Sequence, residues 1–382
     1  MSRVVPAPGR PALLLLAALL ALLAIAAPAG ATGPGTPAGK RYVALGDSYS
    51  SGPGLAPSRE PGCGRSAVNY ASRLAAALGL GPERLGNWAD YSCAGATVRR
   101  GKAPGISIPD QVRWATQEGA LGPATRAVSL TAGGNDSWSG RPHDALSAIL
   151  AACVASGPPC GPGRRVGPLA QLLPEGLTAL LPTGVAQLLA APLAGAREDD
   201  RWTTPAQVTA ARATARLAPA VAAIREAAPR ATIALVGYPQ VVPTAGRPGC
   251  AGPLGLGWSL EAGEVRYVNA LLDALDGALR SAVAELDRPG APVRYVDLRG
   301  PSRGHDLCAG PDAWVSAPVA QGLGFLGSSL HPNRRGMDAF ATVVERLVDG
   351  TGLRPAEPAR TTPRRPGSGV AVATAAALAA RR

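Results

Sequence analysis

The chain has 382 residues, of which 46% are hydrophobic and only 4% aromatic, so Ala, Leu and Val must fill the core of one large domain or two ordinary ones. Its 48 Gly and 38 Pro residues favour turns and irregular loops over long helices. The net charge is +12, of which residues 1–31 carry +2 and residues 350–382 carry +5, so residues 32–349 carry +5 (12 − 2 − 5). These residues contain no Lys/Arg-rich run, which argues against a nucleic-acid partner.

The first 31 residues are typical of a secretory signal peptide. Arg3 and Arg10 precede an uninterrupted apolar run over 12–27, and the small residues Ala29 and Ala31 form a cleavage signal. The alternative is an uncleaved membrane anchor, but the 16-residue run is shorter than the ~20 residues that a membrane-spanning helix needs. We therefore expect cleavage after Ala31 and a secreted, extracellular protein.

Short apolar strands alternate with helices along the body of the chain. Residues 32–40 form a linker, and the domain is expected to span 41–349 as one unit. The predicted strands are 41–45, 88–92, 127–131, 232–237 and 293–298. The predicted helices are 66–78, 145–154, 205–228, 260–286 and 333–347. Because strands such as 232–237 are almost wholly apolar, both of their faces should be covered, which predicts an α/β protein: a three-layer α/β/α domain with a central parallel sheet.

Two segments lie outside this alternation. Residues 166–196 are apolar and irregular, and they fit an acyl-binding pocket, an interfacial patch or ordinary core packing equally well. Residues 350–382 are rich in Pro and Arg and end in an apolar run of 12 residues, which is too short to span a bilayer. We expect this tail to be disordered.

Six cysteines follow the predicted signal peptide. An even number in an exported chain indicates three disulfides, and the cysteines are too scattered for a metal site. Six cysteines allow 15 pairings. We expect the sequential set, in which Cys63 pairs with Cys93, Cys153 with Cys160 and Cys250 with Cys308.

Ser48 is a candidate nucleophile. The stretch VALGDSYSSG places it just past the first predicted strand, and ligands of open α/β sheets bind beyond the carboxyl ends of the strands. Gly, Asp and Ser are also ordinary turn residues, so the position by itself fits a polar turn. A catalytic serine also needs a base and donors for the oxyanion.

The base must be one of three histidines, His143, His305 or His331. His331, in SSLHPN, lies on the loop before the last predicted helix, and in other α/β serine hydrolases the base likewise follows the serine late in the chain. Two loops offer oxyanion donors: the Gly95 N–H in SCAGATV and the Asn135 side chain in LTAGGND.

In this order, GDSYSSG, SCAGATV, GGND and HPN resemble the sequence blocks of the SGNH (GDSL-type) hydrolases, over residues 43–347. The export signal and six cysteines make the chain most similar to the secreted actinobacterial esterase, lipase and phospholipase branch. The resemblance implies Ser48 as nucleophile, His331 as base, and an oxyanion hole made by the N–H groups of Ser48 and Gly95 and the side chain of Asn135. It also implies a flavodoxin-like fold with no metal and no cofactor.

One position departs from the family pattern. Many members carry Asp three residues before the catalytic His, where this chain has Ser328. An acid would fix the imidazole tautomer, so without one a backbone carbonyl must orient the ring. We predict a Ser48–His331 dyad oriented by the Ser328 carbonyl, with Asp306 as the alternative acid.

The predicted reaction is hydrolysis of a carboxylic ester through an acyl-enzyme, with a rate that rises through a histidine pKa near ~6.5. Acyl lipids or phospholipids are favoured if residues 166–196 line the site. We expect a monomer that acts on small-molecule or lipid esters, with transient contact to a lipid interface, and structural roles for Asp47 and Asp136. Two alternatives stay open: a carbohydrate acetylesterase on the same fold, and a non-catalytic secreted cell-surface binding protein.

Overall fold

The computed structural model describes residues 38–99, 107–139, 145–155, 160, 202–244, 250, 260–318, 328–349, 351 and 353. The predicted signal peptide, the segment 166–196, most of the linker and nearly all of the predicted tail lie outside the described residues. Among the helices that are described, none is both long enough and apolar enough to cross a membrane.

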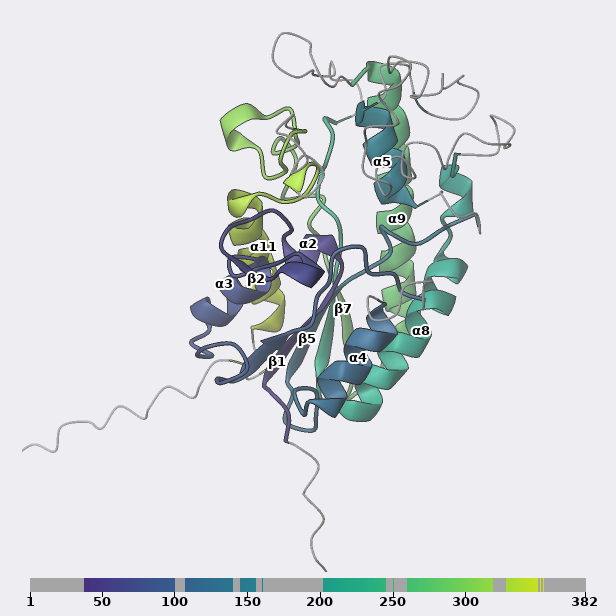
Figure 1. Cartoon of the computed structure of the whole chain (residues 1–382). Coiled ribbons are helices and arrows are strands. Elements are labelled where there is room, and N and C mark those ends of the chain that lie inside the picture. The colour runs from purple at the N-terminus through teal and green to yellow at the C-terminus, as the bar shows by residue number, and fades with distance from the viewer. Residues whose placement is uncertain are drawn as a thin grey trace, which may run out of the picture.

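Five parallel strands form a single sheet at the centre of the molecule (Figure 1). They are β1 (Tyr42–Gly46), β4 (Trp88–Asp90), β5 (Ala127–Thr131), β6 (Thr232–Val236) and β7 (Val293–Val296). Their spatial order is β4-β1-β5-β6-β7, and the register places Gly46 of β1 opposite Thr131 of β5. Numbered by their order in the chain, these strands run 2-1-3-4-5, which is the flavodoxin-like arrangement.

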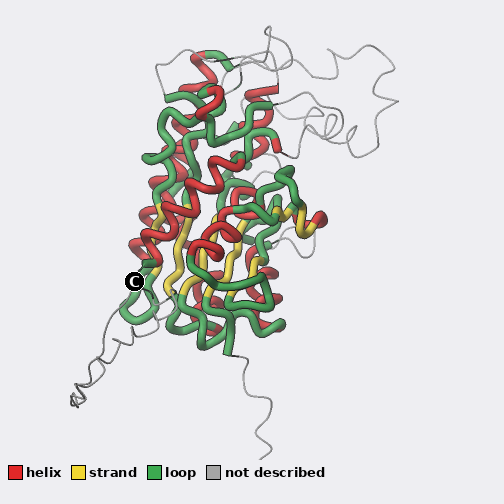
Figure 2. Tube along the Cα trace, turned by 90° about the vertical axis from the view of Figure 1, so that its left-hand side faces the viewer, coloured by secondary structure: helices red, strands yellow, loops and turns green. Residues whose placement is uncertain are grey.

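Helices cover both faces of the sheet, as Figures 1 and 2 show from two directions. On one face lie α3 (Tyr70–Ala77) and α11 (Arg334–Val348), and on the other lie α4 (Ile108–Gln117), α8 (Ala210–Ala227) and α9 (Ala262–Leu286). Side chains of β1 alternate between the two sides: Tyr42 and Ala44 join the core under α11, whereas Val43 and Leu45 join the other core. The expected three-layer α/β/α fold is confirmed.

Helix α9 is much longer than the sheet is tall. Its 25 residues span about 38 Å, against about 17 Å for a five-residue strand. Because α9 leads into β7, its C-terminal end lies near the start of the strands, and its first half extends past their carboxyl ends. There it packs beside α5 (Leu146–Ala155), as Figure 1 shows.

The remaining elements are short. They are α2 (Ser48–Ser51), the antiparallel pair β2 (Ser58–Glu60) and β3 (Arg65–Ser66), and the 3-10 turns η1 (Pro61–Cys63), η4 (Pro205–Gln207) and η6 (Gly310–Asp312). The helix predicted over 205–228 is divided between η4 and α8. Helix α4 has no counterpart among the predicted elements, because its buried face includes Asp110 and Gln111, which interrupt the apolar pattern.

Three disulfides are present, with the pairing expected from the order of the cysteines. Cys63–Cys93 joins η1 to the loop after β4, Cys153–Cys160 closes the end of α5, and Cys250–Cys308 joins the chain before α9 to the loop after β7. Cys93 follows β4 and Cys308 follows β7, so two of the three disulfides lie beyond the carboxyl ends of strands.

Candidate active site

Ser48 is the first residue of α2, directly after β1. Asp47 caps this helix by accepting the Tyr49 N–H at 2.9 Å. As the first helical residue, Ser48 has an N–H with no acceptor inside the helix, so the group is available to an oxyanion. The serine is only 6% exposed. The turn therefore presents a nearly buried hydroxyl and a free N–H on the same residue.

Gln111 of α4 holds the backbone on which this turn depends. Its amide accepts the Gly46 N–H at 2.8 Å and donates to the Gly46 carbonyl at 2.9 Å. Gly46 has φ = +141°, and a Cβ there would lie 2.8 Å from the Thr131 carbonyl oxygen, so this position requires glycine. Gln111 is fully buried, and neither its role nor that of Gly46 was predicted from the sequence.

The two loops expected to supply oxyanion donors are bound to each other. Asn135, after β5, donates from Nδ2 to the Ala96 carbonyl at 3.1 Å, which leaves the second amide hydrogen for a ligand. Its neighbour Asp136 accepts the Val98 N–H at 3.1 and 3.2 Å, so Asp136 has the local structural role expected of it. Gly95 is exposed with φ = +79°, and none of the described residues lies within 4 Å of the place where its Cβ would be.

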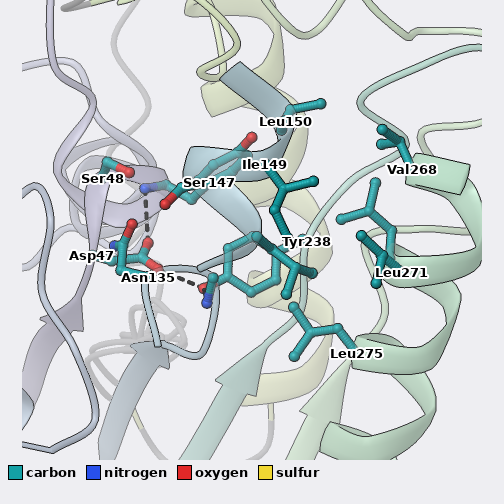
Figure 3. Close-up of a pocket in the computed structure, with 14 residues that line it drawn as sticks. Asp47, Ser48, Asn135, Ser147, Ile149, Leu150, Tyr238, Val268, Leu271 and Leu275 are labelled. Carbon is teal, nitrogen blue, oxygen red and sulfur yellow. Dashed lines mark hydrogen bonds between the residues drawn. The ribbon is translucent and has the colours of Figure 1, made fainter. Parts of the chain in front are cut away.

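A pocket opens beside Ser48 and Asn135 (Figure 3). The polar groups lie on one side, and the opposite wall is apolar, formed by α5 and the first half of α9. The apolar lining residues are Leu146, Ile149, Leu150, Val268, Leu271, Leu272 and Leu275.

His331 lies in the loop before α11, and its ring contacts a different carbonyl from the one predicted. Nδ1 is 2.8 Å from the carbonyl oxygen of Ser329, whereas the Ser328 carbonyl accepts the His331 backbone N–H at 3.2 Å. The prediction that the Ser328 carbonyl orients the ring was therefore wrong. The Ser328 carbonyl closes the backbone turn, and the Ser329 carbonyl faces the ring. Since a carbonyl only accepts, Nδ1 carries the proton and Nε2 keeps its lone pair.

The other residues considered for the base and the acid lie elsewhere. Asp306 accepts the Cys308 N–H at 2.9 Å and makes no hydrogen bond with His331. His305 is stacked on Trp314 at 4.4 Å, with its Nδ1 on a carbonyl of the same loop, and His143 falls outside the described residues. Among the residues that are described, no group of three or more His, Cys, Asp and Glu side chains could hold a metal ion.

Tyr49 connects His331 to the serine turn. Its ring centroid lies 5.5 Å from that of His331, and its hydroxyl donates to the Leu330 carbonyl at 2.7 Å. Leu330 has φ = +63°, a conformation that is strained in a residue with a Cβ, directly before the histidine. No hydrogen bond joins His331 to the Ser48 hydroxyl in this structure, and catalytic hydrogen bonds are often longer in unliganded sites.

Burial changes two acid–base groups in opposite directions. It lowers the pKa of His331 to about 4, and the hydrogen bond to the Ser329 carbonyl offsets this only in part. It raises the pKa of Asp47 to about 7, against the stabilising hydrogen bonds from Tyr238 and from the Tyr49 N–H. Burial thus places the pKa of His331 below the ~6.5 expected from the sequence.

Comparison with known proteins places the chain in a family. Residues 44–339 match the model of the GDSL-like lipase/acylhydrolase family. The chain is also 30% identical over 317 residues to Lipase 2 of Streptomyces coelicolor, an alignment that covers 82% of this chain and 86% of that protein. The chain belongs to the GDSL-like lipase/acylhydrolase family. Membership makes it a carboxylic ester hydrolase that acts on small-molecule esters.

A solved structure shows the same fold as this acylhydrolase. The crystal structure of phospholipase A1 from Streptomyces albidoflavus aligns with a TM-score of 0.50 at 22% identity, and covers 81% of this chain and 99% of that one. In this acylhydrolase, Ser48 and Asn135 line one pocket. The Asn135 side chain bonds to Ala96, the residue after Gly95. Tyr49, the residue after Ser48, packs against the ring of His331.

The role of Gln111 can be tested by Gln111→Ala. The substitution leaves the buried Gly46 N–H without its acceptor, whereas the Gly46 carbonyl keeps the hydrogen bond from the Cys93 N–H. One unsatisfied buried group costs about 1–3 kcal/mol, so we expect the free energy of unfolding to fall by about 1–3 kcal/mol. Gln117→Ala, at an exposed position of the same helix, should change it by less than about 0.5 kcal/mol. Urea unfolding monitored by circular dichroism measures both, and equal losses would contradict the assignment.

Proposed function

We propose that the pocket hydrolyses carboxylic esters of acyl lipids through a Ser48–His331 dyad and an acyl-enzyme. The observation that carries this proposal is the shared pocket, in which Ser48 and the Asn135 amide lie opposite an extended apolar wall (Figure 3). A nucleophile and an oxyanion donor on one side and an acyl-sized apolar surface on the other are the parts that ester hydrolysis requires.

The reaction proceeds in two halves. His331 Nε2 takes the proton of the Ser48 hydroxyl while the oxygen attacks the ester carbonyl, and the imidazolium then gives that proton to the departing alcohol. Water repeats the sequence on the acyl-enzyme and releases the acid. In both halves the oxyanion accepts hydrogen bonds from the Ser48 N–H, the Gly95 N–H and the Asn135 amide.

The dyad works with a carbonyl in the place of an acid. The Ser329 carbonyl fixes Nδ1–H, so Nε2 is the free base. Burial favours the neutral ring, so His331 is ready to accept a proton at any pH above about 4, the value to which burial lowers its pKa.

The apolar wall indicates the substrate class. The described part of the pocket places α5 and α9 leucines across from Ser48, and each CH₂ of an acyl chain buried there contributes about 0.8 kcal/mol. An acetyl group would leave most of this wall uncovered, so the wall favours acyl lipids or phospholipids over acetylated carbohydrates. The relatives named above are a lipase and a phospholipase A1, which agrees with this class.

We also propose that the enzyme is secreted. Three disulfides in the described residues suit an oxidising compartment, and residues 1–31 have the pattern of a signal peptide. An extracellular enzyme whose apolar pocket accepts acyl chains would meet its substrate at a lipid surface, as a monomer.

The nucleophile is tested with a fluorophosphonate probe. We expect the probe to label Ser48 alone and to abolish hydrolysis of p-nitrophenyl esters, with the site located by mass spectrometry of peptides. Ser48→Ala should neither label nor turn over, and His331→Ala should lose nearly all turnover. Asn135→Ala should lower kcat by ~10²–10³ because one oxyanion donor is lost.

A protein that does not label, while a known esterase does under the same conditions, would favour a binding protein without activity. Labelling at a serine other than Ser48 would overturn the assignment of the nucleophile. Unchanged turnover in His331→Ala would contradict the assignment of His331 as the base.

The acyl wall is tested with p-nitrophenyl esters of increasing chain length. We expect kcat/KM to rise from acetate toward medium chains until the pocket is filled. Leu271→Phe narrows the pocket on the side opposite Ser48, and should lower kcat/KM for the longer esters about tenfold relative to the short ones (Figure 3).

Leu286→Phe is the matched control, because Leu286 is buried at the far end of the same helix and does not line the pocket. It should leave the chain-length profile unchanged. Activity confined to acetyl esters would instead support the carbohydrate acetylesterase.

The low pKa of His331 predicts activity in acid. A base is active when neutral, so kcat/KM should fall only as pH drops toward about 4, the pKa expected from burial. At about pH 5 a histidine with an ordinary pKa would keep only roughly 3% of its activity. The control is recovery of full activity after return to neutral pH, which excludes acid unfolding. An acid limb centred near the ordinary histidine value would contradict the prediction.

A further inference from the structure

Tyr238 lies at the junction of two catalytic loops although it belongs to neither. It follows β6 by two residues, is 7% exposed, and lines the pocket beside Ser48 (Figure 3). Its hydroxyl donates to Oδ2 of Asp47 at 2.5 Å and accepts the Gly134 N–H at 2.7 Å. One oxygen thus joins the residue before the nucleophile to the residue before Asn135.

The Tyr238 hydroxyl satisfies a buried group on each of its two partners, Asp47 and Gly134. The Asp47 carboxylate is buried, and its other oxygen is already used by the Tyr49 N–H. The Gly134 N–H is buried too, and it would be left without an acceptor if the hydroxyl were removed. A Cβ on Gly134 would meet the Tyr238 hydroxyl at 3.0 Å, so the loop approaches the ring closely. The hydroxyl is therefore tightly held between the two loops.

A second tyrosine carries the connection toward the histidine. The Tyr49 ring packs edge-on against Tyr238, with centroids 5.1 Å apart and planes at 78°. The Tyr49 hydroxyl binds the carbonyl of Leu330, next to His331. The loops that follow β1, β5 and β7 thus meet on two tyrosine rings.

We propose that Tyr238 is a positioning residue of the active site, whose hydroxyl fixes the Asn135 loop relative to the Ser48 turn. This inference rests on the proposed Ser48 chemistry. Tyr238 donates nothing to the substrate itself, because its hydroxyl donates to Asp47 and its oxygen accepts the Gly134 N–H. Its effect is on the distance between the nucleophile and the oxyanion donor, and a displacement of about 1 Å can lower a rate about 10²-fold.

Tyr238→Phe removes the hydroxyl and keeps the ring that lines the pocket. We expect kcat for a p-nitrophenyl ester to fall about 10–100-fold, with KM unchanged within about twofold, because the acyl wall is intact. The matched control is Tyr91→Phe. Tyr91 also follows a strand and is buried, and its hydroxyl also binds a carboxylate, that of Glu118 at 2.8 Å, but it does not line the pocket. Both variants should lose some stability, and only Tyr238→Phe should lose kcat.

The pair Tyr238→Phe and Asn135→Ala tests the route of the effect. If the hydroxyl acts by placing the Asn135 loop, its loss matters little once the amide is gone, so Tyr238→Phe should lower kcat less than about threefold in the Asn135→Ala background. Endpoint labelling with a fluorophosphonate counts the folded sites in each sample, and kcat is expressed per labelled site.

Three results would overturn the inference: kcat of Tyr238→Phe equal to that of Tyr91→Phe, a loss confined to KM, or the same loss of kcat with and without Asn135. A wild-type protein that neither labels at Ser48 nor hydrolyses esters would instead defeat the proposed function. The two failures are therefore distinguishable.

Discussion

The carbonyl of Gly46 accepts hydrogen bonds from the Gln111 amide at 2.9 Å and from the Cys93 N–H at 2.9 Å, and these fix the end of β1. The next N–H, that of Asp47, is bound by the Thr131 carbonyl at 3.0 Å. The last residue of one strand is thus tied to a helix, to the loop before Gly95 and to the neighbouring strand. These hydrogen bonds set where the serine turn begins, and the geometry of the site depends on this constraint.

The sheet order explains why the proposed nucleophile and the proposed oxyanion donor lie close together. In the order β4-β1-β5-β6-β7, the chain leaves β1 toward one edge and continues from β5 toward the other. The connections therefore diverge and leave a crevice at the carboxyl ends of these two strands. Ser48 follows β1 and Asn135 follows β5, so both face that crevice. The length of α9 adds the apolar wall, because its first half extends past the sheet.

Patterns that repeat along the chain could be predicted from the sequence, and contacts made by single residues could not. Strand β5 was predicted over 127–131 and spans Ala127–Thr131, because a strand buried on both faces is apolar throughout. Helix α4 was missed because buried polar residues interrupt its apolar face. Tyr238 and Gln111 act on residues 191 and 65 positions away, and nothing in their local sequence indicates these partners. The carbonyl that orients His331 was predicted to be that of Ser328 and is that of Ser329. Sequence spacing identifies a turn but not the direction in which each of its carbonyls points.

Among the residues that the structure describes, no carboxylate bonds to the His331 ring, and this agrees with the electrostatics of the pocket. The site already contains one buried carboxylate, that of Asp47, and burial raises its pKa to about 7 in spite of two hydrogen bonds. A second carboxylate would have to be desolvated in the same region, whereas the Ser329 carbonyl orients the ring without a charge. A neutral carbonyl, however, stabilises the imidazolium of the transition state less than a carboxylate would. In the proposed mechanism, more of the stabilisation then comes from the oxyanion donors, which act only if they are rigidly placed. The hydrogen bonds that hold the Asn135 loop, to Ala96, Val98 and Tyr238, supply that rigidity.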